Sequence, residues 1–153
     1  MSTVEDRLAA LGLTVPVLVP PVAAYVPAAV TGSLVYTAGQ LPFVDGALPA
    51  TGKVGAEVTP EEAADLARIC ALNMIAAVAS VVDLDRVVRV VKVVGFVASA
   101  PGFTGQPAVI NGASNLLKDA FGEAGVHARS AVGVASLPLD APVEVEMIVE
   151  IAG

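Results

Sequence analysis

The clearest helix start in the chain is followed, after a short turn, by a valine-rich strand pattern, and this order restricts the folds that the sequence can adopt. Thr59 can accept a hydrogen bond at the N-cap, Pro60 suits the first helical position, and Glu62 would close a capping box. Apolar residues then recur at helical spacing, and we expect the helix to end near Val82. Residues 86–98 are rich in valine and predict a long strand.

The remaining patterns extend this alternation of helix and strand. Residues 107–122 carry apolar side chains at helical spacing, and residues 129–137 predict a strand of small residues. Residues 143–151 alternate between an apolar face and a face with three glutamates. Nearer the start, residues 34–38 predict a strand, and the Asp-Gly pair at 45–46 predicts a hairpin turn. The order predicts an α+β fold, a mixed β-sheet with two helices packed on one face.

The first 21 residues differ in pattern from the rest of the chain. Residues 3–11 predict a short helix capped by Thr3, and a Pro-rich segment after it can form neither a helix nor a central strand. We expect this segment to lie over the body of the protein. The chain is therefore divided into an N-terminal extension, 1–21, and a single domain, 22–153.

The composition leaves two alternatives, a membrane protein or a soluble oligomer. The hydrophobic content is 56% and the mean hydropathy is +0.78, both high for a soluble protein. The longest charge-free helical stretch, 69–82, is shorter than the ~20 apolar residues of a membrane span, and polar Asn73 and Ser80 interrupt it. The charged residues 5–7 exclude a signal peptide. An oligomer explains the apolar excess better, because an obligate interface resembles a core cut in half.

The charge balance argues against nucleic-acid binding. Eight basic residues face fifteen acidic ones, for a net charge of −7, whereas affinity for RNA or DNA rests on lysines and arginines. A small anion held by one arginine remains compatible with this charge. The single cysteine, Cys70, is predicted to be buried and fits the reducing cytoplasm, where we expect the protein to reside.

Few residues in the sequence suggest chemistry. His127 is the only histidine, which excludes a site with several histidine ligands, and a lone histidine is more often structural than catalytic. Arg129 opens a strand of small residues that could leave room for a carboxylate, although a strand-end arginine also commonly extends into solvent. Glu144 and Glu146 share a strand face that is either solvated or lines a cleft where one of them activates water. The sequence alone does not choose between them.

Three motifs carry a resemblance to a known family. They are residues 36–42, Tyr-Thr-Ala-Gly-Gln-Leu-Pro, residues 128–132, Ala-Arg-Ser-Ala-Val, and Leu-Pro at 137–138 followed by Val-Glu-Val-Glu at 143–146. In this order and spacing the chain resembles the RidA/YjgF family, also labelled L-PSP endoribonuclease, over about residues 22–151. The resemblance implies a chorismate-mutase-like fold and a homotrimer whose sheets form a central β-barrel. It also implies ligand clefts between subunits.

The resemblance further implies a cofactor-free hydrolase, with no metal, that converts reactive enamines and imines such as 2-aminoacrylate to a 2-keto acid and ammonia. Arg129 matches the arginine that grips the substrate carboxylate, and Glu144 matches the acid that positions or activates water. The other positions that match residues of the family's cleft are Tyr25, Gly39, Gln40 and Asn111.

Two cleft positions depart from the family pattern. Ala38 stands where active members often have serine, and Ala131 where they often have cysteine, so the expected cleft is more apolar. Together with the N-terminal extension, these departures resemble a longer subgroup. They keep open the alternative of a non-catalytic trimer that binds small carboxylate metabolites, or of a chaperone or regulator. Ribonuclease activity is disfavoured by the acidic charge and by the lack of a second histidine.

Overall fold

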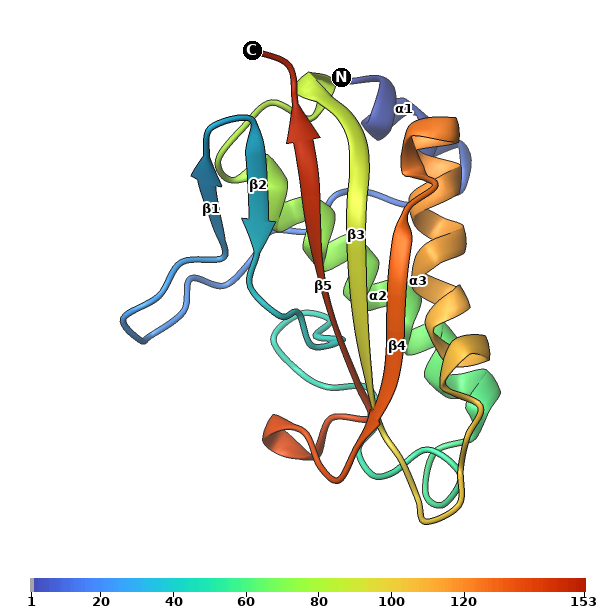
Figure 1. Cartoon of the computed structure of the whole chain (residues 1–153). Coiled ribbons are helices and arrows are strands. Elements are labelled where there is room, and N and C mark those ends of the chain that lie inside the picture. Colours follow the sequence, from blue (N-terminus) through green and yellow to red (C-terminus); the bar gives the residue numbers. More distant parts are fainter. Residues whose placement is uncertain (1) are drawn as a thin grey trace.

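A mixed five-stranded sheet forms one layer of the computed structural model, which describes residues 2–153, and two long helices form the other layer (Figure 1). The strands are β1 (Ala28–Thr31), β2 (Leu34–Thr37), β3 (Val87–Ala98), β4 (Ala128–Val134) and β5 (Val143–Ile151). Their order in the sheet is β1-β2-β5-β3-β4. Only the pair β3 and β4 is parallel among these strands, because α3 carries the chain back between them.

Both long helices cover the same face of the sheet, as the sequence predicts (Figure 1). The helices are α1 (Thr3–Ala10), α2 (Pro60–Ala79) and α3 (Gln106–Phe121), with short 3-10 turns η1 (Leu84–Arg86), η2 (Gly122–Gly125) and η3 (Pro138–Asp140). The helix α2 packs against β5 and β2, whereas α3 packs against β3 and β4. The α+β expectation with a mixed sheet is therefore confirmed.

The helix caps differ from the expected ones. Thr59 accepts a hydrogen bond from the Glu62 amide, but the return bond of a capping box is not formed at α2. The complete box occurs at α1, where the Ser2 hydroxyl accepts from the Glu5 amide and the Glu5 carboxylate accepts from the Ser2 amide. The prediction that Thr3 caps this helix is wrong, because Thr3 is its first helical residue.

Several element boundaries shift by one to three residues from those predicted, whereas β5 has the predicted bounds. The helix α2 ends at Ala79 rather than near Val82, because the Ser80 hydroxyl donates to a carbonyl of the last turn and the chain then turns toward η1. The strand β4 ends at Val134, before the turn that begins at Leu137-Pro138. At Asp45-Gly46 both residues adopt positive φ as a tight turn requires, but the flanking residues form a single bridge rather than two strands.

The N-terminal segment lies over the body of the protein only in its first part, because Val19, Val22 and Val26 of the Pro-rich segment are exposed. Val4 and Leu8 of α1 are buried in the main core, and side chains of the Pro-rich segment pack against the same core: Leu13, Val15 and Leu18. Cys70 is buried in α2, and burial raises the pKa of its thiol well above the ordinary value. No helix within residues 2–153 is both long enough and apolar enough to cross a membrane.

The strand register decides which side chains face the helices and which face away. Met147 of β5 and Arg129 of β4 both pair with Val93 of β3, whose side chain is buried on the helix side. Glu144 pairs instead with Phe96 of β3. Phe96 lies three residues after Val93, an odd number, so its side chain points to the opposite face of the sheet. Side chains at directly paired positions share a face of the sheet, and the face alternates along each strand. Arg129 and Glu144 therefore lie on opposite faces.

The face without helices is partly apolar. Tyr36 and Val132 on this face are each 44% exposed, and Val94, Phe96 and Ile148 are half-buried between them and the glutamates of β5. The sheet thus has one face closed by helices and one face open to solvent in the single chain (Figure 1).

Candidate functional site

The guanidinium group of Arg129 is fixed by three polar atoms of α3. Its Nη1 donates to Asn111 Oδ1 at 2.8 Å and to Ser114 Oγ at 3.3 Å, and its Nη2 donates to the Pro107 carbonyl at 3.4 Å. Arg129 is only partly exposed because it lies between β4 and this helix. These bonds hold the charged group in one orientation before any ligand arrives.

The same bonds leave part of the guanidinium group available. An arginine has five N–H donors, and the three bonds engage both of those on Nη1 and one on Nη2. Within residues 2–153, the Nε–H group and the second Nη2–H group of Arg129 have no protein acceptor. Two neighbouring N–H groups of this kind match the two oxygens of a carboxylate. The geometry of Arg129 is therefore suited to hold a carboxylate.

The small residues after Arg129 leave less space than the sequence suggested. Ala131 packs against the core below α3. A side chain at Gly133 would meet the Gln106 amide at 2.8 Å and the Ser99 hydroxyl at 3.0 Å, so those groups already occupy that position. The open space beside Arg129 lies on its other side, toward the C-terminal half of α3.

His127 and Ser114 form a hydrogen-bonded pair next to Arg129, and Ser114 also bonds the guanidinium group. The sequence does not assign either residue to the site. His127 Nδ1 lies 2.6 Å from the Gly125 carbonyl, so Nδ1 carries the proton, because a carbonyl only accepts. Its Nε2 lies 2.9 Å from Ser114 Oγ and accepts the hydroxyl proton. Burial lowers the pKa of His127, and the charge of Arg129 lowers it further against the effect of the Gly125 bond. The lowered pKa favours the neutral imidazole.

Sequence spacing contained a signal for these two residues. Ser114 lies one turn after Asn111 on α3, and His127 lies two positions before Arg129, where strand alternation places it on the same face. Both positions become informative only when the helix and the strand are known to be neighbours.

Glu144 lies near Gly39 on the open face of the sheet. A Cβ atom at Gly39 would come within 2.5 Å of Glu144 Oε1, so glycine is required for the carboxylate to occupy this place. Burial raises the pKa of Glu144, and the neighbouring negative charge of Glu146 raises it further. A carboxylate with a raised pKa is suited to take a proton from water.

The predicted site residues thus form two separate groups in the single chain. Arg129, Asn111 and Ala131 lie at the edge between β4 and α3, whereas Glu144 and Gly39 lie on the opposite face. Two other predicted positions, Ala38 and Gln40, flank Gly39 in the sequence. The Ala38 amide donates to the Pro27 carbonyl, and Gln40 exchanges backbone hydrogen bonds with Val145 of β5. Tyr25 is 60% exposed in the loop before β1.

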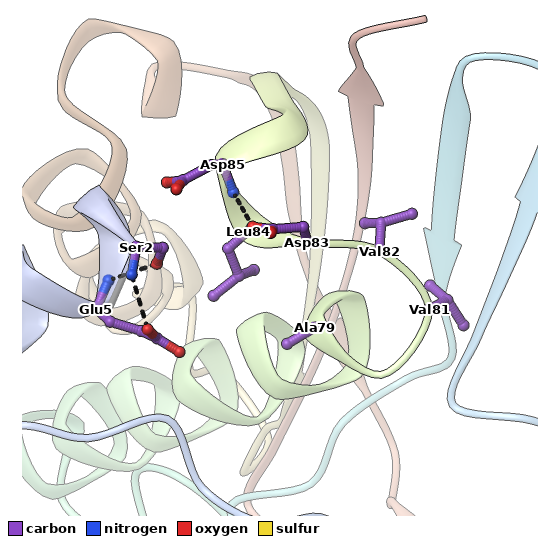
Figure 2. Close-up of a pocket in the computed structure, with 8 residues that line it drawn as sticks. All are labelled: Ser2, Glu5, Ala79, Val81, Val82, Asp83, Leu84 and Asp85. Atoms are coloured by element: carbon purple, nitrogen blue, oxygen red, sulfur yellow. Dashed lines mark hydrogen bonds between the residues drawn. The ribbon is translucent and has the colours of Figure 1, made fainter.

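A pocket of about 230 Å³ opens beside Arg129, between the second half of α3 and the start of β4. A larger open hollow of about 670 Å³ lies where α1 meets η1 (Figure 2). The carboxylates of Glu5, Asp83 and Asp85 line that hollow and accept bonds from the amides of Ser2, Asp85 and Thr3, respectively. They hold the N-terminal helix and the turn in place, and none of the lining residues within 2–153 has a basic side chain.

A mixed five-stranded sheet with both long helices on one face defines an α+β protein. The model of the family described as "YjgF/chorismate mutase-like, putative endoribonuclease" matches residues 5–151. The chain belongs to this family, as its sequence motifs indicate. The match begins inside α1, whose apolar face is part of the core.

Individual relatives are similar over nearly the whole chain. Protein TCP17 of Trypanosoma cruzi is 45% identical over 150 residues, which are 97% of this chain and 94% of the relative. The structure of Atu1372, a protein of unknown function from Agrobacterium tumefaciens, is 48% identical, with a TM-score of 0.92 over 98% of this chain and 93% of the other. Escherichia coli TdcF with bound serine is 28% identical, with a TM-score of 0.61 over 87% of this chain and 92% of the other.

Proposed function

We propose that this protein hydrolyses small 2-imino acids and their enamine tautomers to a 2-keto acid and ammonia. The observation that carries the proposal is the Arg129 guanidinium, which α3 holds in place with two adjacent N–H groups free. Such a fork suits the carboxylate that every 2-imino acid carries. A family neighbour, TdcF, was solved with serine, which also carries a carboxylate next to a carbon bearing nitrogen.

The proposal requires a second subunit. Glu144 and Arg129 lie on opposite faces of one sheet, so one chain does not place both against the same small ligand. A closed homotrimer would bring the Arg129 edge of one subunit against the Glu144 face of its neighbour and would repeat this contact three times. It would also cover apolar side chains such as Tyr36 and Val132, which the single chain exposes.

The chemistry needs only positioning, a base and charge stabilisation. Arg129 holds the carboxylate, and ionised Glu144 takes a proton from a water molecule whose oxygen attacks the imine carbon. The C=N bond opens and its nitrogen takes up a proton. The hydroxyl group of the resulting carbinolamine gives its proton to Glu144, and the nitrogen takes up a second proton. The C–N bond then breaks with its electron pair on nitrogen, ammonia leaves, and the C=O bond of the 2-keto acid forms. No electrons are gained or lost overall.

An imine-trapping assay tests the proposal. An amino-acid oxidase generates 2-imino acids, semicarbazide traps the fraction that survives, and the trapped product is compared with and without the protein. Less trapped product with the wild-type protein than with buffer would support hydrolysis. Equal amounts for a series of side chains would exclude it.

A non-catalytic binder of small carboxylate metabolites is the second candidate. The observation that favours it is the pair Ala38 and Ala131, which places methyl groups where active members of the family often have serine and cysteine. In this case calorimetry would detect binding of a 2-keto acid, and the imine assay would show no acceleration. The Arg129 clamp serves both candidates equally.

Replacing Glu146 by glutamine should move the acid limb of the pH profile to lower pH. The negative charge of Glu146 contributes to the raised pKa of Glu144, so its removal favours the ionised form of Glu144 and lowers that pKa. If ionised Glu144 is the base, kcat/KM then persists to lower pH than in the wild type. Glu150→Gln, farther along β5, is the control and should leave the limb in place. An acid limb that stays fixed or moves upward in Glu146→Gln contradicts the role of Glu144.

A further inference from the structure

The pocket of about 230 Å³ beside Arg129 has a chemical character of its own. Its polar walls are Ser114, Asn115 and Lys118 of α3 together with His127 and Arg129 at the start of β4. The volume is below the roughly 300 to 1,000 Å³ of typical drug-sized sites, which restricts an occupant to a small molecule or to one end of it.

The pocket concentrates positive charge in an acidic protein. Two of the eight basic residues of the chain, Lys118 and Arg129, line it, although the net charge of the chain is −7. None of the described residues that line it is acidic. A concave site with one sign of charge and no internal counter-ion attracts the opposite charge.

The hydrogen bonds inside the pocket leave two of its donor side chains, Lys118 and Asn115, without a protein acceptor among residues 2–153. Ser114 donates its proton to His127 Nε2 and accepts from Arg129 Nη1, so these neutral groups satisfy one another. The Lys118 ammonium group is exposed at the pocket wall and forms no ion pair within residues 2–153. Asn115, one residue after Ser114, adds an amide that can also donate.

We propose that this pocket binds a second carboxylate of the substrate, with Lys118 as its cation, so that the protein prefers dicarboxylic 2-imino acids and their 2-keto products. Arg129 is also part of the pocket wall, so a small ligand held by its guanidinium group lies beside the pocket. This inference rests on the function proposed above for its choice of substrate. The charge of the pocket is independent of the hydrolytic step.

Calorimetry with two unreactive 2-keto acids of equal chain length tests the pocket. The probes are 2-oxoglutarate and 2-oxopentanoate, which differ only in the second carboxylate. We expect the wild-type protein to bind 2-oxoglutarate about tenfold more tightly, a difference of about 1.4 kcal/mol. Lys118→Met should abolish this preference, whereas Lys53→Met, outside the pocket, should retain it. Equal binding of the two acids by the wild type, or a preference that survives Lys118→Met, would overturn the proposal.

The single histidine gives a direct reading of where the ligand binds. Because His127 is the only histidine, its ring signals in an NMR spectrum need no further assignment. We expect 2-oxoglutarate to shift these signals in the wild type and in Lys53→Met, but far less in Lys118→Met. Ring signals that stay unchanged at saturating 2-oxoglutarate would place the second carboxylate elsewhere and overturn the proposal.

The imine assay separates this proposal from the proposed function. Selective, Lys118-dependent binding of 2-oxoglutarate without any imine clearance would support the pocket and exclude hydrolysis. Imine clearance that is equally fast for imines with and without a second carboxylate would support hydrolysis and overturn the pocket.

Discussion

Arg129→Ala should lower kcat/KM for 2-imino acids by about 30- to 150-fold, because a hydrogen bond to a charged group contributes about 2 to 3 kcal/mol here. The variant loses the bidentate contact with the substrate carboxylate. It also frees Asn111 and Ser114 on the exposed side of α3, where water can replace the guanidinium group. The imine-trapping assay measures the effect, and 2-keto acid affinity should fall in parallel.

Two further variants separate the fork from the charge of Arg129. Arg129→Lys retains the charge but has no planar fork, so it should recover only a small part of the activity. Arg89→Ala is the matched control, because Arg89 lies on β3 with its side chain 62% exposed in a long contact with Glu150. An exposed pair of this kind contributes little. Wild-type rates in Arg129→Ala would contradict the clamp.

Gly112→Ala should destabilise the protein by about 3 kcal/mol, although alanine is the better helix former. Gly112 lies in α3 where this helix crosses α2, and a Cβ atom there would overlap the carbonyl oxygen of Ala64. A backbone carbonyl inside a helix cannot move aside as a flexible side chain can, so the two helices must separate. Urea unfolding at one fixed protein concentration measures the change.

The sign of that change distinguishes packing from helix propensity. Propensity alone predicts that alanine stabilises a helix interior by up to about 1 kcal/mol relative to glycine. Asp119→Ala, at an exposed position of the same helix, is the control and should change the free energy of unfolding by less than about 0.5 kcal/mol. A Gly112→Ala protein as stable as the wild type would contradict the claim that α2 and α3 have no room for a methyl group at this position.

Much of the fold follows from local patterns in the sequence. The alternation in β5 predicts both its bounds and its buried face, because a strand with one covered face must place every second side chain inside. The Pro60 helix start is predicted for the same kind of local reason. Helix ends are harder to predict, since α2 ends where the Ser80 hydroxyl bonds a carbonyl of the last turn. Ser2 is hard to identify as the cap of α1 because Thr3 offers the same hydroxyl chemistry one residue later.

The candidate site was predictable only in part. Arg129 and Glu144 stand out through the motifs around them, but their placement on opposite faces depends on how β4 and β5 each pair with β3. The hydrogen bond between His127 and Ser114 depends on the packing of α3 against β4, because the two residues are 13 apart in the chain. The spacing of these residues in the sequence becomes informative only when the helix and the strand are known to be neighbours.

A mixed-trimer experiment tests most directly the claim that the site is shared between subunits. Arg129→Ala and Glu144→Gln chains carrying different tags would be produced together, purified through both tags, and checked for a solution mass of three 15.3 kDa chains. In a closed trimer, every mixed assembly has one site that combines intact Arg129 from one chain with intact Glu144 from its neighbour. We predict recovery of roughly a third of the wild-type rate of imine clearance, from two parents that are each far slower than this. Mixed trimers as slow as their parents would contradict a shared site.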